Sequence, residues 1–284
     1  MCRFTFYRGP PIALSSLITE PTNSLIHQSF HSHEREEPLN GDGFGVAWYA
    51  DGRPEPALFR SITPAWSNRN LRELAAVVRS SCILAHVRAA TQQTDVMETN
   101  CHPFKRGVIA FMHNGDIGGF RKLRRPLIDS LSDAAYQGIA GSTDSEHFFA
   151  VLQDELGVGR GRAAGDKMEP ALEGAIGRIL ELRARHAPEE HCYLNMVVTD
   201  GHSAVACRFT TDDPDNADSL YLNHGRRYVC EDNVCRMVDP EEGGAAVLIS
   251  SESLSEDPGW TPVPVNSLVV IGPTLSLTSR AMRV

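Results

Sequence analysis

The chain opens with MCRFTFYRG (residues 1–9), the stretch that decides the fold. Residues 4–8 alternate as a β-strand does. Cys2 becomes the amino terminus once Met1 is cleaved, and a side chain as small as cysteine permits that cleavage. Its own α-amine, which titrates near ~8, can then serve as the base for its thiol. We therefore expect a strand with an N-terminal nucleophile at its start, provided that other segments complete the site.

Four further segments can complete such a site. MHNGDI places Asn114 and Gly115 after a strand, where a side-chain amide and a backbone N–H can converge on an oxyanion. HVRAAT ends a strand with Arg88, whose planar fork suits a carboxylate, and GSTDSE puts Asp144 at a helix start, where it can bind an ammonium group. Arg and Asp together describe recognition of an α-amino acid head group. NCHPF positions His102 before a proline.

Composition bounds the function. The 284 residues are 42% hydrophobic, enough to bury a sizeable core, and carry a formal charge of −9. That charge argues against nucleic acid as a partner, because phosphate binding needs a basic face. Apolar runs such as residues 245–249 are too short to cross a bilayer, and the first residues do not form a secretory signal. We expect a soluble, cytoplasmic protein with no membrane partner.

The periodicity of the chain favours strands, then helices, then strands again. Helices are predicted from Ser67 or Asn68 through residue 78, from the Thr143–Glu146 capping box onward, and over about residues 169–187. A surface loop is expected at residues 157–166. Strands are predicted at residues 4–8, 43–49, 83–89, 108–114, 195–199, 204–210, 219–224, 246–250 and 267–271. This order indicates an α+β layered domain rather than alternating βαβ units.

The seven cysteines lack the regular spacing of a disulfide scaffold, so we expect most to be free and buried. Cys101 beside His102 mimics a catalytic dyad, but neighbours on an extended segment point opposite ways, so Cys101 is interpreted as a buried thiol.

Two other sets of residues suggest a metal site without supporting one. Neither set has ligand spacing with a second pair, which favours solvated or core residues, and no metal or cofactor is expected. The two sets are His27, His31 and His33, and Cys230 with Cys235.

In its motifs, the chain resembles the class II glutamine amidotransferases. The opening MCRF and five later motifs occur in the family's order over about the first 150 residues; LISSESL (248–254) and PGW (258–260) match more loosely. The resemblance implies the four-layer αββα sandwich of N-terminal nucleophile hydrolases, as a single domain over residues 2–284 with its motif-rich part at 2–150. The five motifs are NGDGFGVAWY (40–49), AHVRAAT (85–91), NCHPF (100–104), FMHNGDI (111–117) and STDSE (142–146).

The resemblance also implies roles for residues. Cys2 is the expected nucleophile, Asn114 and Gly115 the oxyanion hole, Arg88 the partner of the substrate carboxylate and Asp144 the partner of its amino group.

Two more residues belong to the expected substrate-binding set, Thr91 and His102. For His102, a role in shaping its loop is preferred and substrate contact is the alternative. Asp42 is expected to fix a turn. The chain departs from the ammonia-channelling synthases at Ala89 and Gln92, which puts the shape of the leaving-group side in doubt.

Among stand-alone members, MCRFTFYRG, NGDGFGVAWY and SITPAWSNRNL (61–71) resemble the amidotransferase-like subunit of the fungal glutathione-degrading complex. The ergothioneine-pathway γ-glutamyl hydrolase is similar but more distant. Our first hypothesis is therefore hydrolysis of a small-molecule γ-glutamyl substrate, a glutathione-like peptide or other conjugate, through a Cys2 thioester. One alternative is a glutaminase that supplies ammonia to a separate synthase subunit. Another is a catalytically silent subunit that retains Met1. A partner hydrolase or synthase subunit fits these hypotheses.

Overall fold

The structure is a computed structural model that describes residues 2–34, 39–90, 95–157, 165–231, 234–240 and 244–284. The Cα positions divide the chain into two compact units, each built from two separate stretches. Unit 1 comprises Met1–Pro103 with Ser219–Val263, and unit 2 comprises Phe104–Asp218 with Pro264–Val284. This division does not test the expectation of one domain over residues 2–284, which stays a prediction.

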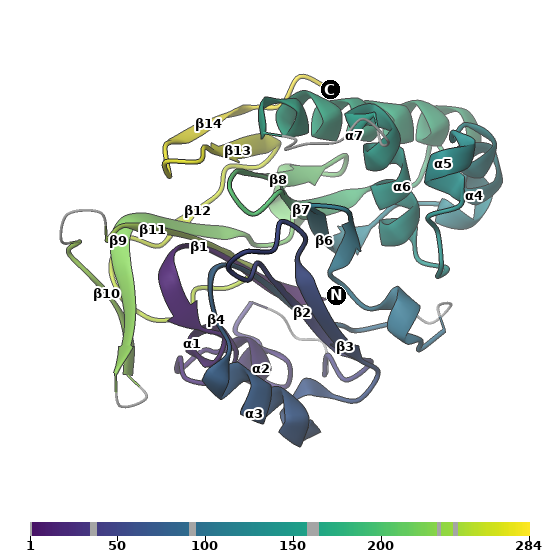
Figure 1. Cartoon of the computed structure of the whole chain (residues 1–284). Coiled ribbons are helices and arrows are strands. Elements are labelled where there is room, and N and C mark those ends of the chain that lie inside the picture. The colour runs from purple at the N-terminus through teal and green to yellow at the C-terminus, as the bar shows by residue number, and fades with distance from the viewer. Residues whose placement is uncertain (1, 35–38, 91–94, 158–164, 232–233, 241–243) are drawn as a thin grey trace. The chain divides into compact units, whose positions relative to one another are not determined.

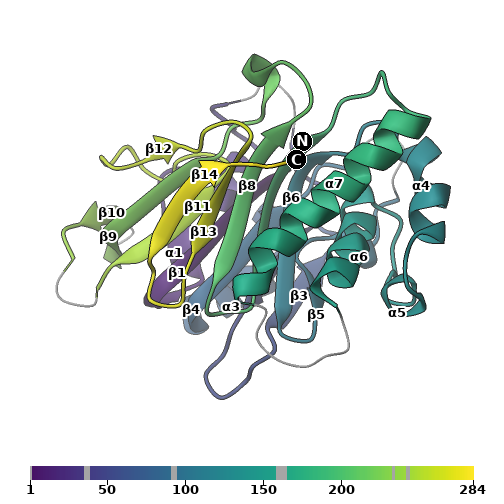
Figure 2. The same cartoon turned by 90° about the horizontal axis from the view of Figure 1, so that it is seen from above.

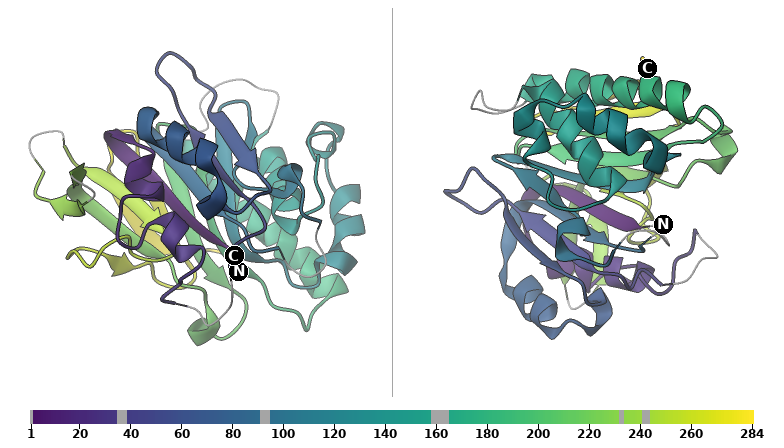
Figure 3. Two further views of the ribbon diagram at one scale, coloured as in Figure 1. Left: turned by 90° about the horizontal axis from the view of Figure 1, so that it is seen from below. Right: turned by 90° about the vertical axis from the view of Figure 1, so that its right-hand side faces the viewer.

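Unit 1 contains an antiparallel sheet with strand order β10-β9-β11-β1-β4-β2-β3, and β12 pairs with β9. Helices α1–α3 lie along one face of this sheet (Figures 1 and 3). Apolar side chains from the strands and helices, among them Leu17, Leu71, Ile83 and Leu248, form its core. Its elements are β1 (Arg3–Ala13), α1 (Ser15–Ile18), α2 (Leu25–Gln28), β2 (Phe44–Trp48), β3 (Ala57–Ser61), α3 (Arg69–Val77), β4 (Arg79–Val87), β9 (Tyr221–Glu231), β10 (Val234–Val238), β11 (Ala246–Ser250) and β12 (Thr261–Pro262).

Unit 2 contains a second antiparallel sheet, with strand order β14-β13-β8-β7-β6-β5. Helices α6 and α7 pack on this sheet, and α4 packs on both of them (Figure 2). Phe111, Phe148, Ile176 and Met196 represent its apolar core. Its elements are β5 (Phe104–Arg106), β6 (Ile109–Asp116), α4 (Phe120–Asp129), α5 (Asp133–Tyr136), α6 (Asp144–Leu156), α7 (Met168–His186), β7 (Tyr193–Thr199), β8 (Ala204–Thr210), β13 (Ser267–Ile271) and β14 (Leu277–Ala281).

Short 3₁₀ helices span Ala65–Ser67, Glu98–Asn100, Gly165–Lys167 and Pro214–Asn216. No helix in the described parts of the chain is both long and apolar enough to cross a membrane.

The predicted helices and strands are confirmed, but several of their ends differ: β1 extends to Ala13, β9 extends to Glu231 and β4 begins at Arg79. Asn68 caps α3, its side-chain oxygen accepting the Leu71 N–H at 2.8 Å. The Thr143 hydroxyl caps α6 by accepting the Glu146 N–H at 3.2 Å. The loop predicted at residues 157–166 falls mostly outside the described residues.

The sequence pattern missed the following elements: α1, α2, α4, α5, β3, β5, β10, β12 and β14. Helix α4 contains Pro126, which removes a backbone donor and normally disfavours a helix interior. Burial of Leu123 and Leu127 against the core of unit 2 outweighs that cost. Among the missed strands, β14 carries the polar and charged stretch LTSRA and lies at the edge of its sheet, where a strong apolar pattern is not required.

The expectation that most cysteines are free and buried is confirmed. Among the described residues, Cys82, Cys101, Cys192 and Cys207 are buried free thiols, and Cys2 is a half-buried one.

The interpretation of Cys230 and Cys235 as separate solvated or core residues was wrong. These residues form a disulfide. Antiparallel pairing of β9 with β10 places Cys230 directly opposite Cys235, with their Cα atoms 4.0 Å apart. The separation of only five residues between the two cysteines is the sequence signal that could have revealed this bond.

Candidate active site

Cys2 lies at the start of β1 in unit 1. Its side chain is half-buried, and its thiol donates a hydrogen bond to the Ala89 carbonyl oxygen at an S···O distance of 3.7 Å. The guanidinium of Arg3 donates to the Cys2 carbonyl oxygen at 3.1 Å. The backbone of the predicted nucleophile is therefore held by a neighbouring cation, and its thiol points to the residue that follows Arg88.

A buried ion pair anchors this strand end. Arg3 Nε donates to Glu252 Oε1 at 2.7 Å, and each side chain is only 2% exposed. Glu252 also accepts the Ser32 hydroxyl and, at 3.0 Å, the His33 N–H. Burial raises the pKa of Glu252, but these hydrogen bonds and the charge of Arg3 outweigh it and leave the pKa lowered. Sequence reasoning gave Glu252 no role; its signal was a lone acid within LISSESL.

Arg88 follows β4 in unit 1 and is almost fully buried. Its Nη1 donates to the carbonyl oxygens of Asp42 at 3.5 Å and Asp95 at 3.3 Å, which fix the position of the guanidinium. The Asp42 carboxylate accepts the Ala90 N–H at 2.8 Å, which ties Asp42 to the segment after β4, and its expected role in fixing a turn stays a prediction. Thr91 lies outside the described residues, and its substrate-binding role stays a prediction.

His102 and Cys101 are both buried in unit 1 and contact different groups. The ring of His102 stacks on His86 of β4, with ring centroids 4.2 Å apart, which fits the loop-shaping interpretation. The Cys101 thiol donates to backbone carbonyls, including that of Ser61 at 3.6 Å. Burial raises the pKa of Cys101, so its thiol is less available as a thiolate, as a structural cysteine requires.

Asn114 and Gly115 occupy the end of β6 in unit 2. Asn114 is fully buried, and neither its side-chain oxygen nor its nitrogen has a hydrogen-bond partner in the described part of the chain. Gly115 has a φ of +145°, and a Cβ at this position would stand 1.8 Å from the Tyr193 carbonyl oxygen. Only glycine fits there, because both the positive φ and the nearby carbonyl exclude a Cβ.

Asp144 is the first residue of α6. Its Oδ2 accepts the Ile117 N–H at 2.9 Å and its Oδ1 accepts the Ser145 N–H at 2.8 Å. The first of these bonds ties the start of α6 to the backbone just after β6. The structure therefore places Asp144 beside the segment of unit 2 that directly follows Asn114 and Gly115.

Two neighbours in unit 2 were missed by sequence reasoning, although both lie inside the FMHNGDI motif. The buried ring of His113 bonds the Ser145 hydroxyl at 2.8 Å and the Tyr193 carbonyl at 3.1 Å, and burial lowers its pKa. Partial desolvation, together with the charges of Asp144 and Glu190, raises the pKa of Asp116, which is exposed, to about 6. His113 thus braces α6 against the sheet, and Asp116 adds a second carboxyl beside Asp144.

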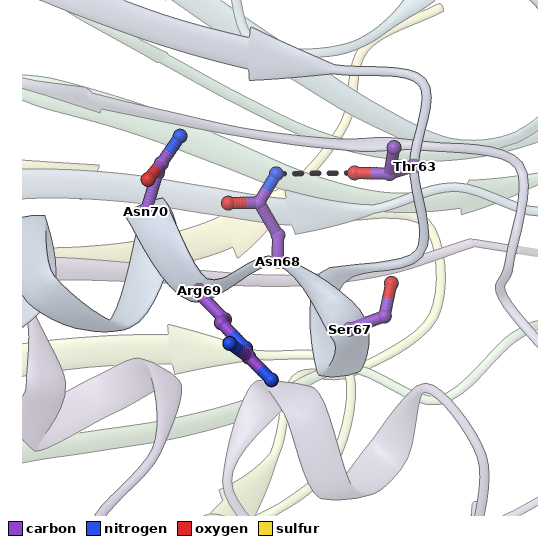
Figure 4. Close-up of a pocket in the computed structure, with 5 residues that line it drawn as sticks. All are labelled: Thr63, Ser67, Asn68, Arg69 and Asn70. Atoms are coloured by element: carbon purple, nitrogen blue, oxygen red, sulfur yellow. Dashed lines mark hydrogen bonds between the residues drawn. The ribbon is translucent and has the colours of Figure 1, made fainter.

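A small open pocket elsewhere in unit 1 is not part of this site. It lies at the start of α3, where the Asn68 amide donates to the Thr63 hydroxyl at 3.1 Å (Figure 4). None of its lining residues belongs to the predicted catalytic set. The lining residues are Thr63, Ser67, Asn68, Arg69 and Asn70.

Comparison with known proteins places these residues in context. A family model described as "Glutamine amidotransferases class-II" matches residues 14–274. "Probable glutamine amidotransferase DUG3" of Saccharomyces cerevisiae is 39% identical over 95% of this chain and 82% of its own length. "Gamma-glutamyl-hercynylcysteine sulfoxide hydrolase" of Mycobacterium tuberculosis is 27% identical over 99% of this chain and 98% of its own length.

Solved structures are similar over the whole chain. A glutamine aminotransferase class-II domain protein from Silicibacter pomeroyi is 30% identical, with a TM-score of 0.70 and full coverage of both chains. Glutamine phosphoribosylpyrophosphate amidotransferase from B. subtilis is 13% identical, with a TM-score of 0.61, and is covered over 49% of its length, so it shows the fold alone. These likenesses confirm the predicted α+β fold of the N-terminal nucleophile type.

Proposed function

Since the chain belongs to the class II glutamine amidotransferases, we propose that it hydrolyses a γ-glutamyl peptide or conjugate, glutathione-like in character, through a thioester on Cys2. The match to the family model and the 39% identity to the yeast relative confirm the family predicted from the sequence. The enzyme class is that of an amidohydrolase acting on γ-glutamyl amide bonds, in line with the names of its yeast and mycobacterial relatives.

The proposed reaction begins with removal of Met1, which frees the α-amine of Cys2. That amine takes the thiol proton, and the thiolate attacks the γ-carbonyl carbon. The side-chain amide of Asn114 and the N–H of Gly115 donate to the oxyanion that forms. The proton is returned to the departing amine, a thioester remains on Cys2, and water hydrolyses it to release glutamate.

The observation that carries this proposal is the unsatisfied amide of Asn114. Both polar atoms of its fully buried side chain are without a partner in the described residues. Leaving a buried polar group unpaired costs about 1–3 kcal/mol, so such groups call for an explanation. A donor held ready for an oxyanion provides one, because the bond is then made only when substrate reacts.

The glutamyl head group is proposed to bind Arg88 through its α-carboxylate and Asp144 through its α-ammonium. Arg88 is held by carbonyl oxygens and Asp144 by backbone N–H groups, so both charged groups are preorganised. Thr91 and His102 remain proposed substrate contacts. The stacking of His102 on His86 favours its role in shaping the loop.

Ala89 supports a leaving group larger than ammonia. Its carbonyl receives the Cys2 thiol, so this small residue lies beside the proposed nucleophile. A small side chain there leaves space for a bulkier amine, and the mycobacterial relative is named for a γ-glutamyl conjugate. A hydrolase or synthase subunit acting as partner is also part of the proposal, with a small-molecule γ-glutamyl compound as substrate.

Steady-state kinetics on glutathione, several γ-glutamyl amides and glutamine tests the substrate. We expect glutamate release and a kcat/KM about ten- to two-hundredfold higher on a γ-glutamyl peptide or conjugate than on glutamine. The isolated protein and the protein with any co-purifying subunit are both measured. Preference for glutamine in both settings would support ammonia supply instead.

One substitution and its matched control test the proposed oxyanion role of Asn114. Asn114→Ala should lower kcat by about 10²–10³-fold. Asn223→Ala removes another buried amide without a described partner, on β9, and should leave kcat within a few-fold. Equal losses in the two variants would contradict the oxyanion role.

The intact mass of the active protein tests the proposed base and should show loss of Met1. Full activity with Met1 retained would contradict the α-amine of Cys2 as base.

A further inference from the structure

Three histidines outside the proposed catalytic set form a cluster in unit 1. His27 lies in α2, and His31 and His33 follow it in the loop after this helix. One ligand nitrogen from each ring lies within 4.8 Å of those of the other two. The rings are arranged edge to face, with centroids 5.2 Å apart for His27 and His31, 5.5 Å for His31 and His33, and 6.4 Å for His27 and His33.

The backbone explains why the rings gather. The His31 N–H donates to the His27 carbonyl oxygen at 2.9 Å, so the chain makes one further helical turn after α2 and brings both rings to one side. The His33 N–H donates to Glu252, which fixes the backbone of the third histidine. No ring nitrogen of the three bonds a protein group among the described residues. Their donor atoms are therefore available to a ligand.

Neutral imidazole nitrogens suit one class of ligand. Three of them on a short segment match the ligand number and type with which proteins hold borderline divalent transition metals, of which Zn²⁺ is the common example. His31 and His33 are exposed, so an ion could enter from solvent and complete its coordination with water. We propose that His27, His31 and His33 bind a divalent transition-metal ion such as Zn²⁺.

The proposed metal site lies next to residues that hold the backbone of Cys2, the proposed nucleophile. Ser32, between two of the ligands, accepts a hydrogen bond from Arg3 Nη2 at 2.8 Å and donates to Glu252. Arg3 in turn donates to the Cys2 carbonyl oxygen. An ion on the three rings would fix the loop that supplies these bonds. The site therefore acts as a brace on the Arg3–Glu252 pair and the start of β1, and its ligands are positioning residues rather than catalytic ones.

Equilibrium Zn²⁺ binding to the full chain, in competition with a chromophoric chelator, tests this site. Wild type should bind one ion that His31→Ala and His33→Ala each bind at least about tenfold more weakly. His224→Ala, which removes an exposed histidine of β9, should leave the affinity unchanged. Cys2→Ala should also retain binding, which separates the proposed site from the thiol. Wild-type affinity in both His31→Ala and His33→Ala, or loss of binding in Cys2→Ala, would overturn the proposal.

Thermal unfolding provides a second measurement, independent of activity. Because a ligand that binds only the folded state stabilises it, Zn²⁺ should raise the Tm of wild type and of His224→Ala. At the same Zn²⁺ concentration it should raise the Tm of His31→Ala by clearly less. An equal rise in His31→Ala would overturn the proposal.

Discussion

The start of β1 and the end of β6 each present a proposed catalytic group, but they hold it by different means. At the start of β1, buried charges do so: Arg3 and Glu252 pair at 2.7 Å, and Arg3 holds the Cys2 carbonyl. At the end of β6, steric fit does so, because Gly115 has space for no side chain. The first region should therefore respond most to loss of charge, and the second to added volume.

The largest effect is expected from Glu252→Ala. This change leaves the buried Arg3 without its counter-ion, which typically costs about 3–5 kcal/mol of unfolding free energy. Glu181→Ala is the matched control, because Glu181 pairs with Arg185 at the surface, where such a pair contributes about 0–1 kcal/mol. Urea unfolding at neutral pH measures both. Equal losses would show that the pair at β1 is no more important than a surface pair.

The same pair predicts a pH dependence. Because the pKa of Glu252 is lowered in the folded state, its contribution is present above its unfolded pKa of ~4.3 and is lost as pH falls through the lower folded value. The stability gap between wild type and Glu252→Gln should therefore narrow as the solution is acidified below about pH 4. A gap that widens on acidification would contradict this linkage.

The next effect concerns the end of β6. Gly115→Ala places a Cβ against the Tyr193 carbonyl and adds strain at φ +145°, for a loss of roughly 2–4 kcal/mol. Gly107→Ala, in the turn before β6, has φ +53° and nothing within 4 Å of the added Cβ. It should lose only about 1–2 kcal/mol. If Gly107→Ala were the more damaging change, the steric account of this strand end would be wrong.

How far the sequence predicted the fold depended on burial. Strands such as β4, whose residues Cys82–Val87 are all buried, have an apolar pattern that can be recognised locally. Helix α4 could not be recognised, since Pro126 argues against a helix and only packing of Leu123 and Leu127 overrides it.

The residues of the candidate site also differ in how far they can be recognised from the sequence. Cys2, Arg88, Asn114, Gly115 and Asp144 stand in motifs that can be read along the chain. Glu252 and the three-histidine cluster depend on contacts that the sequence does not display. Glu252 pairs with Arg3, which is 249 positions away in the sequence. The three histidines come close together only because the turn after α2 brings their rings to one side.

Arg88→Lys should have a smaller effect than the stability variants. It keeps the charge but loses the bidentate fork, so kcat/KM should fall by about 10–100-fold, which corresponds to ~1.4–2.7 kcal/mol. A substrate analogue that lacks the α-carboxylate is the control. Wild type and variant should act on it equally. The same loss on both substrates would show that Arg88 is structural.

The smallest effect is expected at Asp116. Its pKa is raised to about 6, so its carboxyl favours the folded state only while protonated, and unfolding free energy falls as pH rises from about 4 to about 6. Asp116→Asn should therefore be more stable than wild type at pH 7.5, by at most about 1 kcal/mol after solvent screening. The difference should vanish below about pH 4.

Labelling with a glutamine-mimicking diazoketone, located by peptide mass spectrometry, tests whether Cys2 is the nucleophile. Only Cys2 combines a thiol with its own base, whereas burial raises the pKa of Cys101, Cys192 and Cys207. We expect a single label on Cys2 in chains that have lost Met1, and loss of both label and turnover in Cys2→Ala. Comparable labelling of Cys101, or turnover that survives in Cys2→Ala, would contradict Cys2 as the nucleophile.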